Sequence, residues 1–126
     1  MAKTTKKMKT VEQERAAHAL EKIKGVQSGK SFTALANGFP TMIHTNGLGQ
    51  AIAFSKGKSD NQYREMVAML SDWLCSEGRP FAGTRPDDIL TTFTRSDMQT
   101  YLLAQAEAMA YLLWVKKFAK ALIGDE

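Results

Sequence analysis

Residues 95–123 read RSDMQTYLLAQAEAMAYLLWVKKFAKALI and contain neither glycine nor proline. Their apolar side chains recur at the spacing of an α-helix and fill much of its circumference, which is typical of a helix at the centre of its domain. One expected apolar face holds Leu102, Met109 and Leu113, and the neighbouring face holds Tyr101, Ala104, Ala108, Tyr111 or Leu112, Val115 and Leu122. Thr94 followed by Asp97 resembles a capping box. This stretch therefore predicts a long central helix.

Two shorter helices are indicated by their boundary residues. Thr10 is an expected N-cap, and apolar residues follow it at helical spacing as far as Gly25. Asp60 opens a second amphipathic segment, which runs to about Leu74. Residues 76–94 contain two prolines and two glycines, and we therefore expect them to form a long loop.

Glycine and proline divide the segment between these two helices. A short helix is expected from Ser31 to Asn37, with Gly38 as the residue that ends it. Pro40 suits the first turn of a following helix. That helix would contain Gly47 and Gly49, and each glycine costs about 1 kcal/mol in a helix interior. Their presence indicates a kink or the close approach of a neighbouring backbone.

No alternating β-branched run competes with the helical segments, so the sequence predicts an all-α fold. We expect a compact single-domain bundle of about five or six helices over residues 10–126, preceded by a basic arm over residues 1–9. Hydrophobic residues make up 44% and charged residues 24%, the balance of an ordinary globular protein. The lone Cys75 excludes an intramolecular disulfide, and no run of about 18 apolar residues predicts a membrane span. The cytoplasm is the expected location.

Positive charge is concentrated near the beginning of the chain. Residues 1–30 carry eight basic and three acidic side chains, a net charge of +5, whereas residues 31–126 have a net charge of −1. This asymmetry favours a polyanionic partner, because phosphate neutralisation with counterion release is the main sequence-independent contribution to nucleic-acid binding. The alternative is a solvated tail that only aids solubility.

The residues with catalytic potential do not form a recognisable constellation. His18 is expected on a solvent-exposed helix flank, His44 partly buried, and Cys75 as a structural thiol. The acidic pairs Asp87–Asp88 and Asp125–Glu126 lie where solvated carboxylates are usual. Neither of the common glycine-rich phosphate-binding motifs occurs. The sequence therefore predicts a protein without catalysis, metal or cofactor.

Three groups of residues match a known family. The first reads FPTMIHTNGLGQAIAF over residues 39–54 and ends in Lys56. The second joins Tyr63 with Leu70, Trp73 and Leu74, and the third runs from Tyr101 through Glu107 to Trp114, Val115, Lys116, Lys117, Phe118 and Ala119. In this order and spacing they resemble the helical small subunit of the Cmr complex, the type III-B CRISPR RNA-silencing effector. The match extends from about Arg15 to Ala121 and leaves residues 1–9 outside.

The resemblance implies a non-catalytic subunit. In this family, copies stack along a filament of backbone subunits that hold the CRISPR RNA, and target RNA lies between the two rows. The implied partners are therefore other Cmr-complex subunits, neighbouring copies of the chain itself, CRISPR RNA and target RNA, with neither a membrane nor a small-molecule substrate. Cations would contact phosphates without reading bases. The alternative is a helical protein-binding adapter without direct nucleic-acid contact.

On that footing, individual residues are assigned candidate roles. The candidates for nucleic-acid binding are Arg15, Lys22, Lys24, Lys56, Lys58, Lys116, Lys117 and Lys120. The candidates for subunit contact are Asn46, Gly47 and Gln50, which interrupt an apolar helix; tight helix packing is the alternative explanation. Lysines in a last helical turn also complement the helix dipole. Trp73 and Trp114 lie in apolar stripes and are expected in the core rather than stacked on bases.

Overall fold

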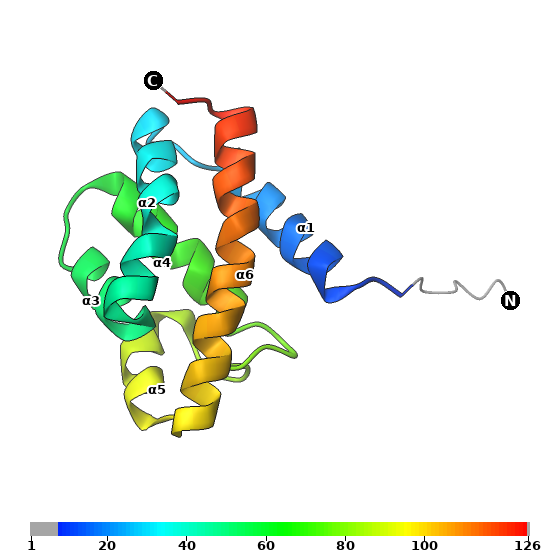
Figure 1. Cartoon of the computed structure of the whole chain (residues 1–126), viewed down its shortest axis with the longest axis vertical. Coiled ribbons are helices and arrows are strands. Elements are labelled where there is room, and N and C mark those ends of the chain that lie inside the picture. The colour runs from blue at the N-terminus through cyan, green and yellow to red at the C-terminus, as the bar shows by residue number, and fades with distance from the viewer. Residues whose placement is uncertain (1–7, 126) are drawn as a thin grey trace, which may run out of the picture.

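The structure is a computed structural model that describes residues 8–125. Over that range the chain forms six α-helices and one 3-10 turn and contains no strand, which confirms the predicted all-α fold (Figure 1). The elements are α1 (Val11–Lys24), α2 (Lys30–Asn46), α3 (Leu48–Lys56), α4 (Asn61–Leu74), η1 (Pro86–Asp88), α5 (Ile89–Arg95) and α6 (Met98–Leu122). Residues 1–7 of the expected arm lie outside the described range.

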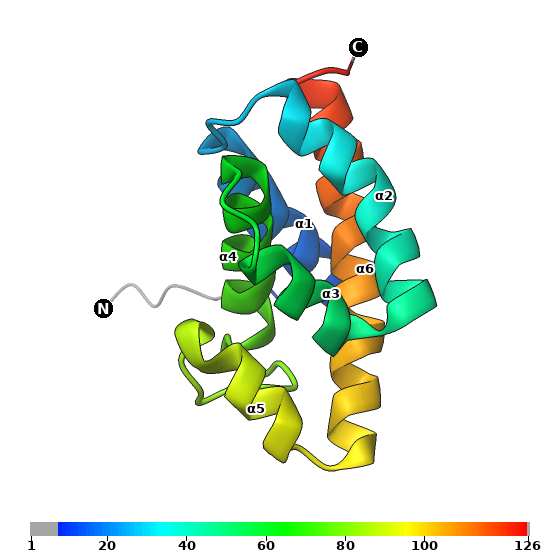
Figure 2. The ribbon, with the colours of Figure 1, turned by 90° about the vertical axis from the view of Figure 1, so that its left-hand side faces the viewer.

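Helix α6 is central, as predicted. It packs against α1, α2 and α4, and both views of the ribbon show α2 beside it (Figures 1 and 2). Its buried residues are Ala104, Ala108, Tyr111, Leu112, Val115 and Ala119. The three alanines let neighbouring helices approach closely. The helix begins at a different cap from the one expected, because Asp97 itself accepts a hydrogen bond from the Thr100 backbone N–H.

One predicted apolar face of α6 is on the surface rather than in the core. The side chains of Leu102 and Leu113 are 54% and 55% exposed, and Met109 is only half-buried. The prediction was wrong because helical spacing marks two apolar faces here, whereas the neighbouring helices of this chain cover only one.

The expected break at Gly38 and Pro40 does not occur. Both residues lie inside α2, which runs without interruption to Asn46. Four buried side chains explain why the helix continues, because they repeat every three or four residues: Phe32, Ala36, Phe39 and Ile43. Their burial outweighs the hydrogen bond that proline removes.

The chain turns sharply at Gly47, between α2 and α3. Its φ of 88° and ψ of 158° belong to a region that is essentially reserved for glycine. A Cβ at Gly49 would overlap the ring of Phe93 from α5. The two glycines therefore mark a kink and a close approach, as predicted, although the close neighbour is a side chain rather than a backbone.

The remaining helices differ from expectation in one place. Thr10 caps α1 in a reciprocal box with Gln13, and Asp60 occupies the N-cap position of α4 without a side-chain cap hydrogen bond. The segment predicted as one long loop instead contains η1 and α5. Ile89 anchors α5, because its side chain is completely buried.

Candidate nucleic-acid interface

Arg15 is engaged inside the protein. Its Nε donates to Glu107 Oε2 at 2.6 Å and a terminal nitrogen donates to Glu107 Oε1 at 2.9 Å, with the two side chains only 18% and 11% exposed. Trp73 Nε1 donates to the same carboxylate at 2.8 Å. Burial raises the pKa of Glu107, but the hydrogen bonds from Arg15 and Trp73 outweigh it and hold this pKa below its usual value. The charge of Arg15 is thus balanced within the chain.

His18 joins three helices, and its expected position on a wet flank was wrong. It is half-buried, with Nδ1 2.6 Å from Tyr111 Oη and Nε2 2.7 Å from Asp72 Oδ2. Lys22 lies 3.5 Å from the same Asp72 oxygen. Burial raises the pKa of Asp72, whereas the hydrogen bond from His18 and the charge of Lys22 lower it, and the net shift is downward. Two of the eight candidate cations, Arg15 and Lys22, therefore already have internal partners.

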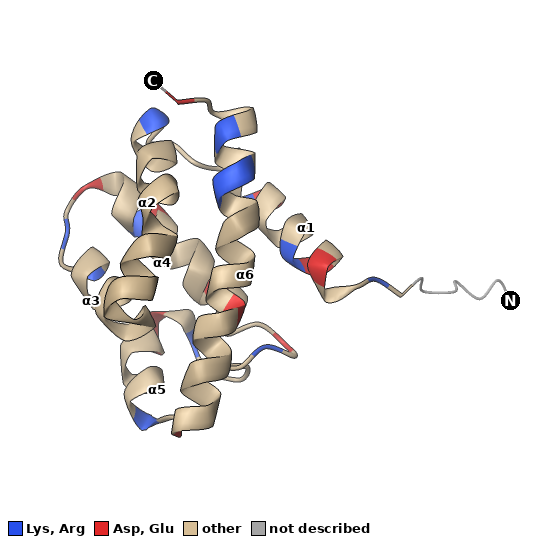
Figure 3. Cartoon of the chain, in the orientation of Figure 1, with Lys and Arg blue, Asp and Glu red and all other residues tan. Residues whose placement is uncertain are grey.

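A group of four lysines, here called the end cluster, comprises Lys30, Lys116, Lys117 and Lys120. The end of α2 lies beside the start of α6, because Leu48 N–H donates to Gln105 and Gly49 N–H donates to Tyr101 Oη. The start of α2 and the end of α6 consequently share the opposite end of the molecule, where both carry basic residues (Figure 3).

The end cluster is free to meet a ligand. All four lysines are exposed, and no carboxylate within residues 8–125 lies within 4.0 Å of their ammonium groups. Sequence reasoning missed Lys30, which precedes the helix that had been expected to begin at Ser31. Only the antiparallel packing of α2 on α6 relates Lys30 to the three later lysines.

One face of α6 carries two kinds of side chain in succession. Helical spacing aligns seven residues, here called the α6 surface face: Met98, Leu102, Gln105, Met109, Leu113, Lys116 and Lys120. Four of the first five are apolar, and three of these four are more than half exposed. The last two belong to the end cluster. An exposed apolar stripe therefore leads directly into exposed positive charge.

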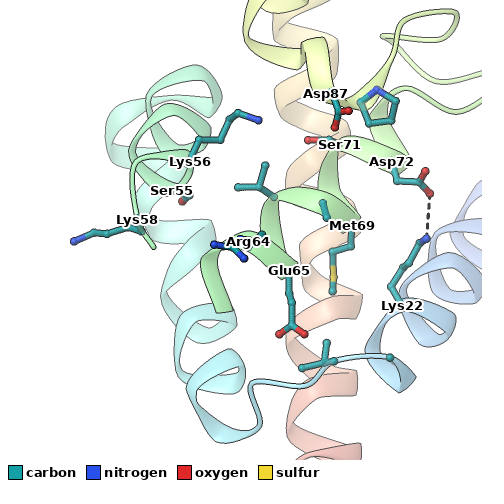
Figure 4. Close-up of a pocket in the computed structure, with 15 residues that line it drawn as sticks. Lys22, Ser55, Lys56, Lys58, Arg64, Glu65, Met69, Ser71, Asp72 and Asp87 are labelled. Atoms are coloured by element: carbon teal, nitrogen blue, oxygen red, sulfur yellow. Dashed lines mark ion pairs between the residues drawn. The ribbon is translucent and has the colours of Figure 1, made fainter. Parts of the chain in front are cut away.

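A groove on another side of the molecule collects further cations. It has a volume of about 690 Å³ and lies between the end of α1, the end of α3, α4 and η1 (Figure 4). Three of the candidate lysines line it, namely Lys22, Lys56 and Lys58. Lys58 lies over the rings of Phe54 and Tyr63 and points away from the groove in Figure 4. Lys24 is exposed near the end of α1.

Arg64 also lines the groove and was not a sequence-based candidate. It lies in the first turn of α4, where no motif marked it, and only the folding of α3 and α4 against each other brings it into the same groove as Lys56.

The three candidates for subunit contact are at the kink between α2 and α3. Asn46 and Gln50 are exposed, whereas Gly47 is half-buried and a Cβ there would lie 3.1 Å from Tyr101 Oη. The conformation of Gly47 and the proximity of Tyr101 explain why a glycine is needed at this position without invoking a partner subunit. Asn46 and Gln50 remain available to a partner.

The other residues with chemical potential are placed as follows. Cys75 is buried, and burial raises the pKa of its thiol. His44 is exposed, so its expected burial was wrong: it lies on the outer side of α2. Asp87 and Asp88 are exposed, as predicted. Within residues 8–125 no cluster of three or more His, Cys, Asp or Glu side chains has the geometry of a metal site.

The two tryptophans differ in their burial. Trp73 is 4% exposed and stacks on Tyr111, with ring centroids 5.4 Å apart and planes 10° apart. This places it in the core, as predicted. The expected core position of Trp114 was only partly right: the ring packs against the core but is half-buried, and its Nε1 donates to Glu12 at 2.7 Å. None of the helices in the described range is long and apolar enough to span a membrane.

Comparison with known proteins points to one family. A family model described as CRISPR-associated protein (Cas_Cmr5) matches residues 11–122. The chain is 30% identical over 122 residues to the CRISPR system Cmr subunit Cmr5 of Thermotoga maritima, and the match covers 95% of this chain and 90% of that protein. The crystal structure of a CRISPR-associated Cmr5 family protein from Thermus thermophilus has the same fold. Its TM-score is 0.78 at 24% identity, covering 92% of this chain and 99% of that one.

Proposed function

Since this chain belongs to the Cas_Cmr5 family and is a small subunit of the type III-B CRISPR complex, we propose that it supports RNA binding there without taking part in cleavage. It packs beside backbone subunits and copies of itself, while its exposed lysines contact phosphates of the CRISPR RNA and target RNA. The contacts are independent of base sequence and serve antiviral defence in the cytoplasm.

The end cluster is the observation that carries this proposal. Lys30, Lys116, Lys117 and Lys120 are exposed at one end of the molecule and have no carboxylate partner within residues 8–125. A single cluster spans few phosphates. Copies that stack side by side would align their clusters into a continuous basic track, which raises affinity through effective concentration.

The other candidate cations divide into two groups. Lys24, Lys56 and Lys58 are exposed and remain candidates for phosphate contact. Arg15 is omitted from the proposed interface, because releasing it from Glu107 would break a largely buried ion pair, and Lys22 is omitted because it already lies 3.5 Å from Asp72.

The apolar part of the α6 surface face supports packing against a protein. Met98, Leu102 and Leu113 are more than half exposed, and a row of such residues along one helix is typical of a surface covered in an assembly. Asn46 and Gln50 are proposed to contact a neighbouring subunit as well. The same stripe is what favours the second candidate function, an adapter that binds only protein.

Two internal arrangements support the non-catalytic assignment. Asp72 in α4 contacts one ring nitrogen of His18, and Tyr111 contacts the other. Neither ring nitrogen is therefore free to activate a serine hydroxyl. Burial raises the pKa of the Cys75 thiol, which disfavours the reactive thiolate.

The test compares Cmr complexes reconstituted with and without this chain. Target-RNA affinity is measured over a range of salt concentrations. We expect the complex that contains the chain to bind more tightly and to lose affinity more steeply with salt, by about 0.7 in the log–log slope for each additional phosphate contact. Equal slopes with and without the chain would favour the adapter.

A further inference from the structure

The groove between α1, α3, α4 and η1 has the size of a ligand site. Its volume of about 690 Å³ is within the range of small-molecule pockets. Figure 4 shows Lys56 extending over it from α3, while Arg64 and Ser71 come from α4. Val26, Val67 and Met69 add apolar surface.

The charges of the groove favour an anion. Three acids line it, and two of them have close partners. Glu65 accepts hydrogen bonds from the backbone N–H groups of Gln27 and Ser28, and Asp72 binds His18 and Lys22. The third, Asp87, is 89% exposed and lies 3.9 Å from Arg85. In contrast, Lys56 and Arg64 have no carboxylate within 4.0 Å in the described part of the chain.

Ser71 supplies an independent indication of a ligand. It lines the groove, is 2% exposed, and its Oγ has no hydrogen-bond partner within residues 8–125. Figure 4 shows this oxygen on the side of α4 that faces Lys56. A buried hydroxyl without a partner is unfavourable, so an acceptor oxygen that entered the groove would satisfy it.

We propose that this groove binds the phosphate group of a nucleotide. Lys56 and Arg64 balance its charge, and Ser71 Oγ donates to a phosphate oxygen. A phosphate has more acceptor oxygens than a carboxylate and can use two cations and a hydroxyl together. The apolar lining takes the sugar and base without selecting the base. These phosphate contacts would be the same for a free nucleotide and for a phosphodiester of an RNA strand. Binding of an RNA strand in the groove rests on the proposed function.

The test is an NMR titration of the isotope-labelled full chain. One arm uses adenosine monophosphate and the other a short single-stranded oligouridylate. We expect amide shifts at residues 56 and 67–72. Ser71→Ala should weaken binding by about threefold to tenfold, the effect of one hydrogen bond. Ser31→Ala, an exposed serine outside the groove, should leave adenosine monophosphate binding unchanged. Ser71→Ala should melt no lower than the parent, because its hydroxyl has no partner to lose.

Matched charge variants separate the groove from the end cluster. Lys56→Gln with Arg64→Gln should weaken binding of adenosine monophosphate by about tenfold or more, whereas Lys117→Gln with Lys120→Gln should not weaken it. Amide shifts at the groove residues with either ligand support the inference, and the ligand that causes them shows whether the phosphate comes from a free nucleotide or from RNA. Shifts with neither ligand, or shifts confined to the end cluster, overturn it. If the groove shows no shifts but the RNA affinity of the complex still depends on Lys116 and Lys120, the proposed function holds and only the groove proposal fails.

Discussion

Arg15 in α1 and Glu107 in α6 are 92 positions apart in the chain and form a two-point ion pair, with nitrogen–oxygen distances of 2.6 and 2.9 Å. Trp73 from α4 donates to the same carboxylate. Three helices are therefore joined at one side chain. An arginine that carried a candidate role in RNA binding instead holds α1 against the central helix.

Removing one member of this pair should destabilise the fold. Arg15→Ala leaves the carboxylate of Glu107 largely buried without its cation, and we expect a loss of about 2–3 kcal/mol in the free energy of unfolding. Urea denaturation measures it. Arg85→Ala is the control, because Arg85 and Asp87 are 80% and 89% exposed, and exposed pairs contribute little. Equal losses of unfolding free energy in the two variants would mean that the Arg15–Glu107 pair stabilises the fold no more than an exposed pair does.

Stability should fall in acid, partly through Glu107. The folded-state pKa of this carboxyl lies below its usual value of 4.5, so its stabilising contribution is complete above about pH 4.5. The contribution is lost as the pH falls through the folded-state pKa. Glu107→Gln should therefore be less stable than the parent at pH 7, and the difference should narrow below about pH 4.5. A difference that stays constant down to pH 3 would contradict this assignment.

Two glycine substitutions should have opposite effects. Gly47→Ala places a Cβ where φ is 88° and Tyr101 Oη is 3.1 Å away, and we expect a loss of about 1–3 kcal/mol. Gly38→Ala lies inside α2 with no atom within 4 Å of the added Cβ. That variant should gain about 0.4–1 kcal/mol, because alanine restricts the unfolded chain. Thermal denaturation of both tests the kink and the unbroken α2 together.

Local patterns predicted the type of fold and failed where tertiary packing decides. The long helix, the Thr10 cap and an irregularity at Gly47 and Gly49 could be recognised from neighbouring residues. The passage of α2 through Pro40 could not, because it depends on Phe39 and Ile43 being buried by other helices.

In the candidate site, too, local spacing predicted only the contacts within one helix. Periodicity grouped Lys116 with Lys120 correctly on one helix face, but the end cluster also contains Lys30, which lies 86 positions before Lys116 on another helix. His18 and Arg15 were misjudged for the related reason that their partners, Asp72 and Glu107, come from distant segments. Spacing along the chain carries no information on such pairs.

The two tryptophans should respond differently to truncation. Trp73→Ala removes a buried ring that also donates to Glu107, and we expect it to cost about 3–5 kcal/mol. Trp114→Ala should cost less, about 1–2 kcal/mol, because that ring is only half-buried. Urea denaturation compares them. If Trp114→Ala leaves stability unchanged but abolishes RNA binding by the complex, the ring stacks on bases instead.

Charge reversal in the end cluster tests where the positive charge acts. Lys116→Glu with Lys120→Glu should leave folding nearly intact, because exposed substitutions usually change stability by about 0.5 kcal/mol or less each. The loss of two cations that complement the α6 dipole adds a little to that cost. The reconstituted complex should nevertheless lose target-RNA affinity and become less sensitive to salt. Its cleavage rate at saturating target should be unchanged, because we propose that this chain takes no part in cleavage.

The same number of charges reversed elsewhere provides the comparison. Lys3→Glu with Lys6→Glu should have the smaller effect, because these residues precede the segment at 11–122 that matches the family. In the proposed stack each change is repeated in every copy, so even one or two lost contacts per copy should be visible in the assembled complex, although we expect the isolated chain to bind weakly. The measurement is target-RNA affinity of complexes that carry each pair of substitutions. If the Lys3/Lys6 variant loses affinity and the Lys116/Lys120 variant binds normally, the end cluster does not face the RNA, and the first residues of the chain supply the positive charge instead.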